Sequence, residues 1–170
     1  MLVVLTTLRD GTAVAWPLVT IALACFLVVL SVIDIRTYRL PDVLTLPMIS
    51  AGIFLHASAG GVGAAANSLA GAVVGYAIIW GLASYWRARF KQDGIGMGDA
   101  KLLAAGGAWC GPFLLPVILL LSSGLGLVFA AGIWLFGKPA DRNIRTTRIP
   151  FGPFLSVGIF SAWWLVPSFA

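Results

Sequence analysis

Long apolar runs separated by short polar stretches dominate the pattern along this chain. A helix that spans a membrane needs about 20 mostly apolar residues. Four runs meet or approach that length: residues 13–35, 64–86, 113–136 and 151–167. Two weaker runs each begin with an aspartate: residues 42–59 and 99–110. Because a short helix is tolerated where neighbouring helices shield its backbone, both weaker runs are counted as helices. Small residues at 58–63 mark the turn between the second and third runs.

This pattern predicts an all-α, polytopic membrane protein with six transmembrane helices in a single domain, residues 1–170. Composition supports that class, because 60% of the residues are hydrophobic, only 10% are charged and the mean hydropathy is +1.00. A soluble domain carries about 25% charged residues. The apolar stretch at 12–33 is longer than a signal-peptide core and follows no basic start, so we expect a retained membrane helix.

The basic residues predict how the helices are oriented. Ten of the eleven Lys and Arg residues fall on one side of the predicted membrane: Arg36, Arg39, Arg87, Arg89, Lys91, Lys101, Lys138, Arg142, Arg145 and Arg148. Lys and Arg accumulate on the cytoplasmic side, so we expect both termini on the non-cytoplasmic side of the membrane. The basic residues of the 137–150 loop suit anionic lipid headgroups. No aromatic-interleaved basic stripe is present, so nucleic acid is not an expected partner.

Cofactor and metal chemistry have little support in the sequence. Cys25 and Cys110 lie inside apolar runs without a metal-ligand spacing, and we expect both to be small buried hydrophobes. His56 is the single histidine and is expected at a membrane interface. No phosphate-binding loop and no Ser/His/Asp set is recognisable. The sequence therefore predicts no cofactor and no bound metal.

The acidic residues are more informative, because all six are aspartates and three lie at the ends of apolar runs. Asp34 stands among apolar residues, and ionisable groups at such depth usually face a bundle interior or a water-filled cavity. Pairing with Arg36 or Arg39 at the interface is the alternative for this side chain. Asp42 and Asp99 each open a run, where capping of a helix N-terminus is the simplest role.

Capping alone does not explain the glycines Gly94, Gly96 and Gly98, which precede Asp99. Glycine permits positive φ and close approach of another backbone, either a substrate strand or a packed helix. The predicted topology places Asp34 and Asp99 at the same membrane face. Two carboxylates that share a site cannot easily both ionise, so one can act as acid while the other acts as base on a water. They are treated as one coupled unit.

At this point the motifs resemble those of a known family. Residues 34–47 (DIRTYRLPDVLTLP), 96–103 (GMGDAKLL) and 150–154 (PFGPF) resemble, in order, signatures of the prepilin peptidases. These are membrane aspartic peptidases of type IV pilus and type II secretion systems. The resemblance implies a six-helix GxGD-type peptidase that cuts the leader from prepilin or pseudopilin precursors at the cytoplasmic membrane boundary. It implies Asp34 and Asp99 as the catalytic pair.

The same motifs carry five further residues. Pro41 and Asp42 belong to the first signature, and we expect Asp42 to be a structural cap. Gly96 and Gly98 would shape the loop before the second catalytic aspartate. Lys101 follows that aspartate by two residues, so on a regular helix it points away and is expected to contact headgroups or substrate.

The chain also departs from the larger members of that family. Those members carry an N-terminal cytoplasmic domain with paired Cys-x-x-Cys motifs, associated with methylating the new N-terminus. Here only about a dozen residues precede the first run, so we expect the compact form, without methyltransferase activity and without zinc. Two other functions remain open: a proton- or cation-coupled transporter that uses the same carboxylates, and a non-catalytic subunit of a pilus or secretion assembly.

Overall fold

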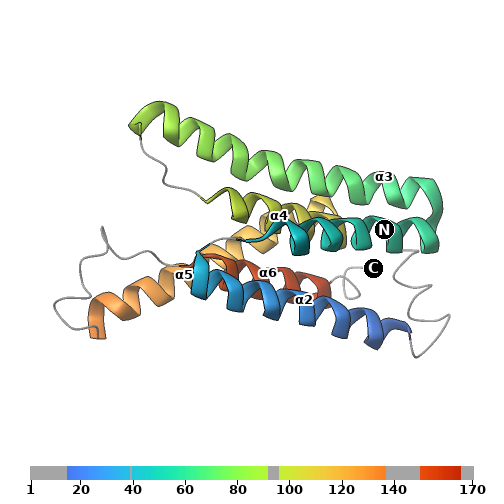
Figure 1. The fold of residues 1–170 in the computed structure, drawn as a ribbon, viewed down its shortest axis with the longest axis horizontal. Helices are drawn as coiled ribbons and strands as arrows, with labels where there is room; N and C mark the ends of the chain where they lie inside the picture. The colour runs from blue at the N-terminus through green and yellow to red at the C-terminus, as the bar shows by residue number, and fades with distance from the viewer. Residues whose placement is uncertain (1–14, 39, 92–95, 137–149, 166–170) are drawn as a thin grey trace.

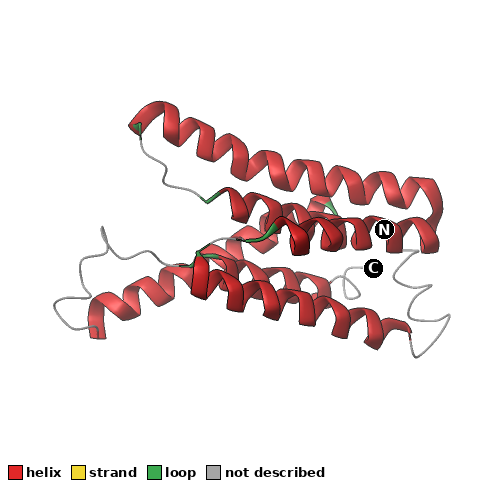
Figure 2. Cartoon of the chain, in the orientation of Figure 1, coloured by secondary structure: helices red, strands yellow, loops and turns green. Residues whose placement is uncertain are grey.

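The structure is a computed structural model that describes residues 15–38, 40–91, 96–136 and 150–165. Every element in this part of the chain is helical, which confirms the all-α prediction for the described residues (Figure 2). The elements in chain order are α2 (Ala15–Thr37), α3 (Asp42–Phe90), α4 (Met97–Cys110), the short 3₁₀ helix η1 (Pro112–Leu114), α5 (Leu115–Phe136) and α6 (Gly152–Leu165).

Three of the described helices are long and apolar enough to cross a membrane: Pro17–Thr37, Asp42–Phe90 and Pro112–Phe136. The first and last match the predicted runs 13–35 and 113–136 closely. The middle one joins the predicted runs 42–59 and 64–86 into one helix of 49 residues. The six-helix count is therefore not confirmed by these long helices.

Helix α3 nevertheless turns back on itself at one residue. Gly61 has φ 68° and ψ −161°, a conformation that glycine adopts without steric cost. The two arms of α3 on either side of Gly61 run in opposite directions (Figure 1). The expected turn at 58–63 is thus reduced to a single break within an otherwise continuous helix.

Helix α4 occupies the centre of the bundle, with α3 on one side and α5 and α6 on the other (Figure 1). Every residue from Leu102 to Cys110 is buried, along with Ala100. Its 14 residues extend only about 21 Å, at 1.5 Å per residue, against about 30 Å for the hydrocarbon core of a bilayer. A helix that is covered on all sides need not span that thickness, because protein replaces lipid around it.

Small residues let α4 pack directly on the second arm of α3. A Cβ atom added at Gly71 would clash with the carbonyl oxygen of Gly107, and one added at Gly107 would clash with that of Gly71. The Ser68 hydroxyl donates to the Ala108 carbonyl at 2.6 Å. Close backbone contact and hydrogen bonds between helices are the usual means of association where lipid is as apolar as the side chains.

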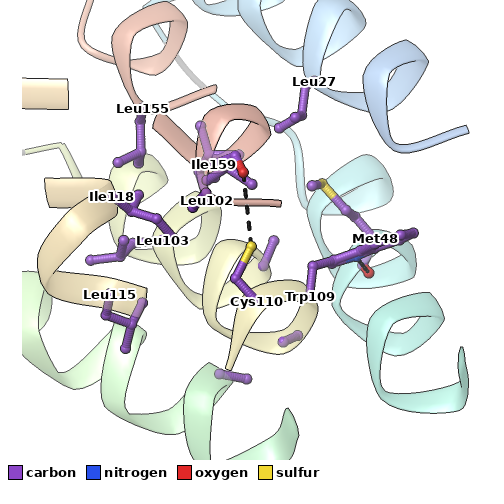
Figure 3. Packing of buried hydrophobic residues seen from close by; sticks show 14 of the residues in the cluster. Leu27, Met48, Leu102, Leu103, Trp109, Cys110, Leu115, Ile118, Leu155 and Ile159 are labelled. Atoms are coloured by element: carbon purple, nitrogen blue, oxygen red, sulfur yellow. Dashed lines mark hydrogen bonds between the residues drawn. The ribbon is translucent and has the colours of Figure 1, made fainter. Parts of the chain in front are cut away.

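The other face of α4 contacts the first arm of α3 and helix α6 (Figure 3). The Trp109 indole Nε1 donates to the Met48 carbonyl at 2.8 Å. The Trp109 ring also meets the Trp163 ring of α6 edge-on, with centroids 5.6 Å apart. The Cys110 thiol lies 3.8 Å from the Ile159 carbonyl, so this cysteine is buried as expected. These contacts fix the position of α4 relative to α3 and α6.

Candidate active site

Asp34 lies near the end of α2 and is 6% exposed. Its Oδ2 accepts a hydrogen bond of 2.9 Å from the backbone N–H of Gly152, the first residue of α6. The first N–H groups of a helix have no partner within the helix, and the helix dipole favours an anion there. A Cβ atom at position 152 would lie 2.6 Å from the same oxygen, so glycine is needed for this contact.

The alternative partner for Asp34 was an arginine at the membrane interface. Arg36 is exposed at the end of α2, and no ion pair joins it to Asp34 within the described ranges. Arg39 lies outside the described residues. The Gly152 amide is therefore the contact that holds the carboxylate in place.

Asp99 lies in the first turn of α4, at the same end of the bundle as Asp34. The residue before it, Gly98, packs against Leu40 of the α2–α3 connection: an added Cβ would lie 3.1 Å from the Leu40 Cβ and 3.3 Å from its nitrogen. The chain segment that follows Asp34 thus contacts the residue that precedes Asp99. The two carboxylates are close enough to interact electrostatically.

The glycines before Asp99 act differently from one another. Gly98 provides the close approach that the sequence suggested, but the neighbouring chain is this protein's own Leu40. Gly96 is exposed and occupies the cap position of α4 with φ −69° and ψ 127°, an extended conformation open to any residue. Positive φ is found at neither glycine. Gly94 lies outside the described residues.

Asp42 and Lys101 form an ion pair that the sequence did not predict. Asp42 is the first residue of α3, and Lys101 lies near the start of α4, so the pair joins the beginnings of the two helices. The expectation that Asp42 caps α3 is wrong, because Pro41 occupies the cap position and α3 has no side-chain cap hydrogen bond. Asp99 is not a cap either, since Gly96 holds that position in α4.

Gly152 is the site residue whose role the sequence did not reveal. Residues 150–154 form a motif at the start of the last run, where Pro and Gly are ordinary helix-start residues. Its contact with Asp34 joins positions 118 residues apart, and no local pattern encodes such a pairing. Only the side-by-side arrangement of α2 and α6 brings the two together (Figure 1).

The structure places the metal-ligating residue types as follows. His56 is 1% exposed, and its Nδ1 lies 2.8 Å from the Gly52 carbonyl, so it is packed within the bundle; its expected position at a membrane interface stays a prediction. The expectation that Cys25 is buried is wrong, because this residue is exposed on α2. Among the described residues, no group of three or more His, Cys, Asp or Glu side chains could hold a metal ion.

The fold and the site define a bundle of apolar helices, three of them long enough to cross a membrane, with two interacting aspartates at one end. Residues 21–131, more than half of the chain, match the model of the type IV leader peptidase family. The chain belongs to that family, as its motifs predicted.

Curated relatives agree with this assignment. The chain is 44% identical to the prepilin leader peptidase/N-methyltransferase of Xanthomonas campestris pv. campestris, over 86% of this chain and 48% of the relative. The protein of that name from Escherichia coli is 43% identical, over 84% of this chain and 62% of the relative. The protein of that name from Neisseria gonorrhoeae is 36% identical, over 88% of this chain and 54% of the relative. This chain therefore spans about half the length of the curated relatives it matches. No solved structure shows a significant match.

Proposed function

We propose that this chain is a membrane aspartic endopeptidase that removes the leader peptide from type IV prepilin-like precursors. Family membership and relatives named prepilin leader peptidase support this function. The observation that carries it is that Asp34, which accepts a hydrogen bond from the Gly152 amide, and Asp99 lie at the same end of the bundle.

In this mechanism the two aspartates share the acid and base roles. One carboxylate accepts a proton from a water molecule as that water attacks the scissile carbonyl. The other is protonated, donates to the carbonyl oxygen and then helps the amine to leave. Like charges in a shared site favour the singly protonated pair, which supplies one acid and one base. The roles belong to the pair and not to one residue, and no covalent acyl-enzyme forms.

The proposed membrane arrangement has six crossing segments: α2, the two arms of α3, α4 shielded inside the bundle, α5 and α6. Exposed basic residues cluster at the end of the bundle that carries the aspartates, among them Arg36, Arg89 and Lys91. Since basic residues favour the cytoplasmic side, the active site would lie at the cytoplasmic boundary of a bacterial inner membrane, with both termini on the opposite side. Lipid would surround the apolar outer surface.

The substrate in this proposal is a prepilin or pseudopilin precursor with a basic leader and an apolar helix. The helix would lie in the bilayer beside the enzyme, which brings its cytoplasmic end to the level of the aspartates. A leader bond at that level could reach the water that the pair activates.

Co-expression with candidate prepilins from the same source tests the function. Wild type, Asp34→Ala and Asp99→Ala are compared by the size of the precursor and the N-terminal sequence of its product. Asp141→Ala serves as the control, because the sequence predicts this aspartate in a polar loop. We expect processing with wild type and the control and none with the other two. Full processing by Asp34→Ala or Asp99→Ala would contradict the proposal.

A further inference from the structure

An apolar groove of about 420 Å³ opens between α2 and α6 on the outer surface of the bundle. This volume is within the range of about 300–1,000 Å³ typical of ligand pockets. Leu27, Val28 and Ser31 line it from α2, and Pro153, Ser156 and Val157 line it from α6. Val28 is 61% exposed and Val157 is 51% exposed, so the groove faces the surroundings of the bundle.

One end of the groove lies close to Asp34 along both helices. On α2 the lining residues recur at helical spacing, and Asp34 lies three residues beyond Ser31, on the same side of the helix. On α6 the lining begins at Pro153, directly after the Gly152 amide that binds Asp34. The groove lining therefore ends within one helical turn of the Asp34–Gly152 hydrogen bond.

The lining contains a hydroxyl group whose hydrogen-bonding capacity is unused. Ser156 is 5% exposed, and its Oγ has no hydrogen-bond partner among the residues that the structure describes. Serines in helices usually donate to the carbonyl one turn earlier. Ser31 does so to Leu27 at 2.7 Å and Ser122 to Ile118 at 2.6 Å. A lipid acyl chain has no group that can hydrogen-bond to Ser156, whereas a polypeptide has backbone N–H and C=O groups that can.

We propose that this groove binds the apolar helix of the precursor, with the N-terminal end of that helix beside Asp34; the inference rests on the proposed function. The first turn of a helix has N–H groups without partners. Ser156 lies one turn into α6 from Gly152, and its buried Oγ lacks a partner among the described residues. In this arrangement an N–H from the first turn of the precursor helix would supply that partner once the helix has entered the groove. The precursor helix also covers the exposed side chains of Val28 and Val157, which accounts for an apolar surface directly next to a pair of carboxylates.

Disulfide cross-linking in membranes tests the groove. The exposed native thiol is removed by Cys25→Ser, and buried Cys110 is kept. Val28→Cys and Val73→Cys are then compared, because their valines are similarly exposed, at 61% and 59%, but lie on α2 and α3. The Asp99→Asn background keeps the precursor whole, and the precursor carries one cysteine in its apolar helix.

We expect the enzyme–precursor disulfide to form through Val28→Cys at least about tenfold more than through Val73→Cys, a bias worth ~1.4 kcal/mol. Equal cross-linking at both positions, or a homodimer linked through Val28→Cys, would overturn the groove assignment. If the protein with Asp99 intact cleaves the precursor but Val28→Cys does not cross-link, the groove fails and the peptidase stands. If the precursor is never cleaved, the proposed function fails and the groove assignment fails with it.

Kinetic constants distinguish a role of the groove in binding the precursor from a role in stabilising the fold. Val157→Trp narrows the groove and is expected to raise KM about tenfold with little change in kcat, whereas Val73→Trp leaves both unchanged. Ser156→Ala should raise KM several-fold without lowering the thermal stability of the protein, because its hydroxyl has no partner to lose. Unchanged KM in both groove variants, or lowered stability with unchanged KM in Ser156→Ala, would contradict the assignment.

Discussion

The contact between Gly152 and Asp34 makes the activity sensitive to a single methyl group. In Gly152→Ala the new Cβ would lie 2.6 Å from Oδ2, 2.9 Å from Cγ and 3.0 Å from Cβ of Asp34. Rotation of the Asp34 side chain about its Cα–Cβ bond moves Oδ2 and Cγ but not Cβ, because the Asp34 Cβ is fixed to the backbone of α2. The end of α2 or the start of α6 must therefore shift, and the hydrogen bond of 2.9 Å is lost or lengthened.

The size of the effect follows from that hydrogen bond and from the displacement. A hydrogen bond to a charged group contributes about 1.5–3 kcal/mol, which corresponds to about 10- to 150-fold in rate at ~1.4 kcal/mol per tenfold. Misplacing a reacting group by about 1 Å can cost about 10²-fold by itself. We therefore expect Gly152→Ala to lower kcat about 10²-fold, with a smaller effect on KM.

The assay compares initial rates of precursor cleavage by purified proteins in lipid. Gly124→Ala in α5 is the matched control, since an added Cβ there meets nothing within 4 Å. Helix content and thermal unfolding confirm that both variants fold. A folded Gly152→Ala protein that cleaves within about twofold of the wild-type rate, a change of only ~0.4 kcal/mol, would refute the reasoning.

Two further predictions concern how α4 is held in place. Reversing one charge, in Asp42→Lys or Lys101→Asp, should lower the free energy of unfolding by about 1 kcal/mol or less, because the pair is partly exposed. The double reversal should recover most of that loss in thermal unfolding, and a double variant no more stable than either single one would count against the ion pair. Gly107→Ala should destabilise the protein by at least about 1–3 kcal/mol, because its Cβ meets the Gly71 carbonyl. Gly63→Ala has open space and should keep wild-type yield and stability, so equal behaviour of the two variants would contradict the packing described.

The sequence predicted the helices well where lipid dictates their length. Runs of about 20 apolar residues are required to cross a bilayer, and this requirement located α2 and α5 to within two residues at their described ends. Counting helices also placed Asp34 and Asp99 at one end of the bundle, where the structure has them. That inference needed only the order of the apolar runs.

Which face of each helix is buried could not be predicted in the same way. In a membrane protein the lipid is as apolar as the core, so the apolar pattern does not separate inside from outside. The prediction that Cys25 is buried is wrong for this reason. The Asp42–Lys101 pair and the Gly152 amide are contacts across 59 and 118 residues, and no local periodicity reports such distances.

The sequence predicted two separate helices where the structure has the single helix α3, and the reason is local. The small residues at 58–63 predict a turn, and glycine does provide the reversal there. A single residue with positive φ is enough to reverse the helix, so most of the expected turn remains helical on both sides of Gly61.

The most direct test of the central claim is the single-turnover rate at which purified protein in liposomes cleaves a prepilin precursor. Asparagine matches aspartate in shape but can neither accept nor donate the required proton. The account predicts that Asp34→Asn and Asp99→Asn each lower this cleavage rate about 10²–10⁴-fold. The double variant should cleave at nearly the same rate as either single variant, because the two aspartates act as a unit. Wild-type cleavage at the same bond by either single variant would contradict it.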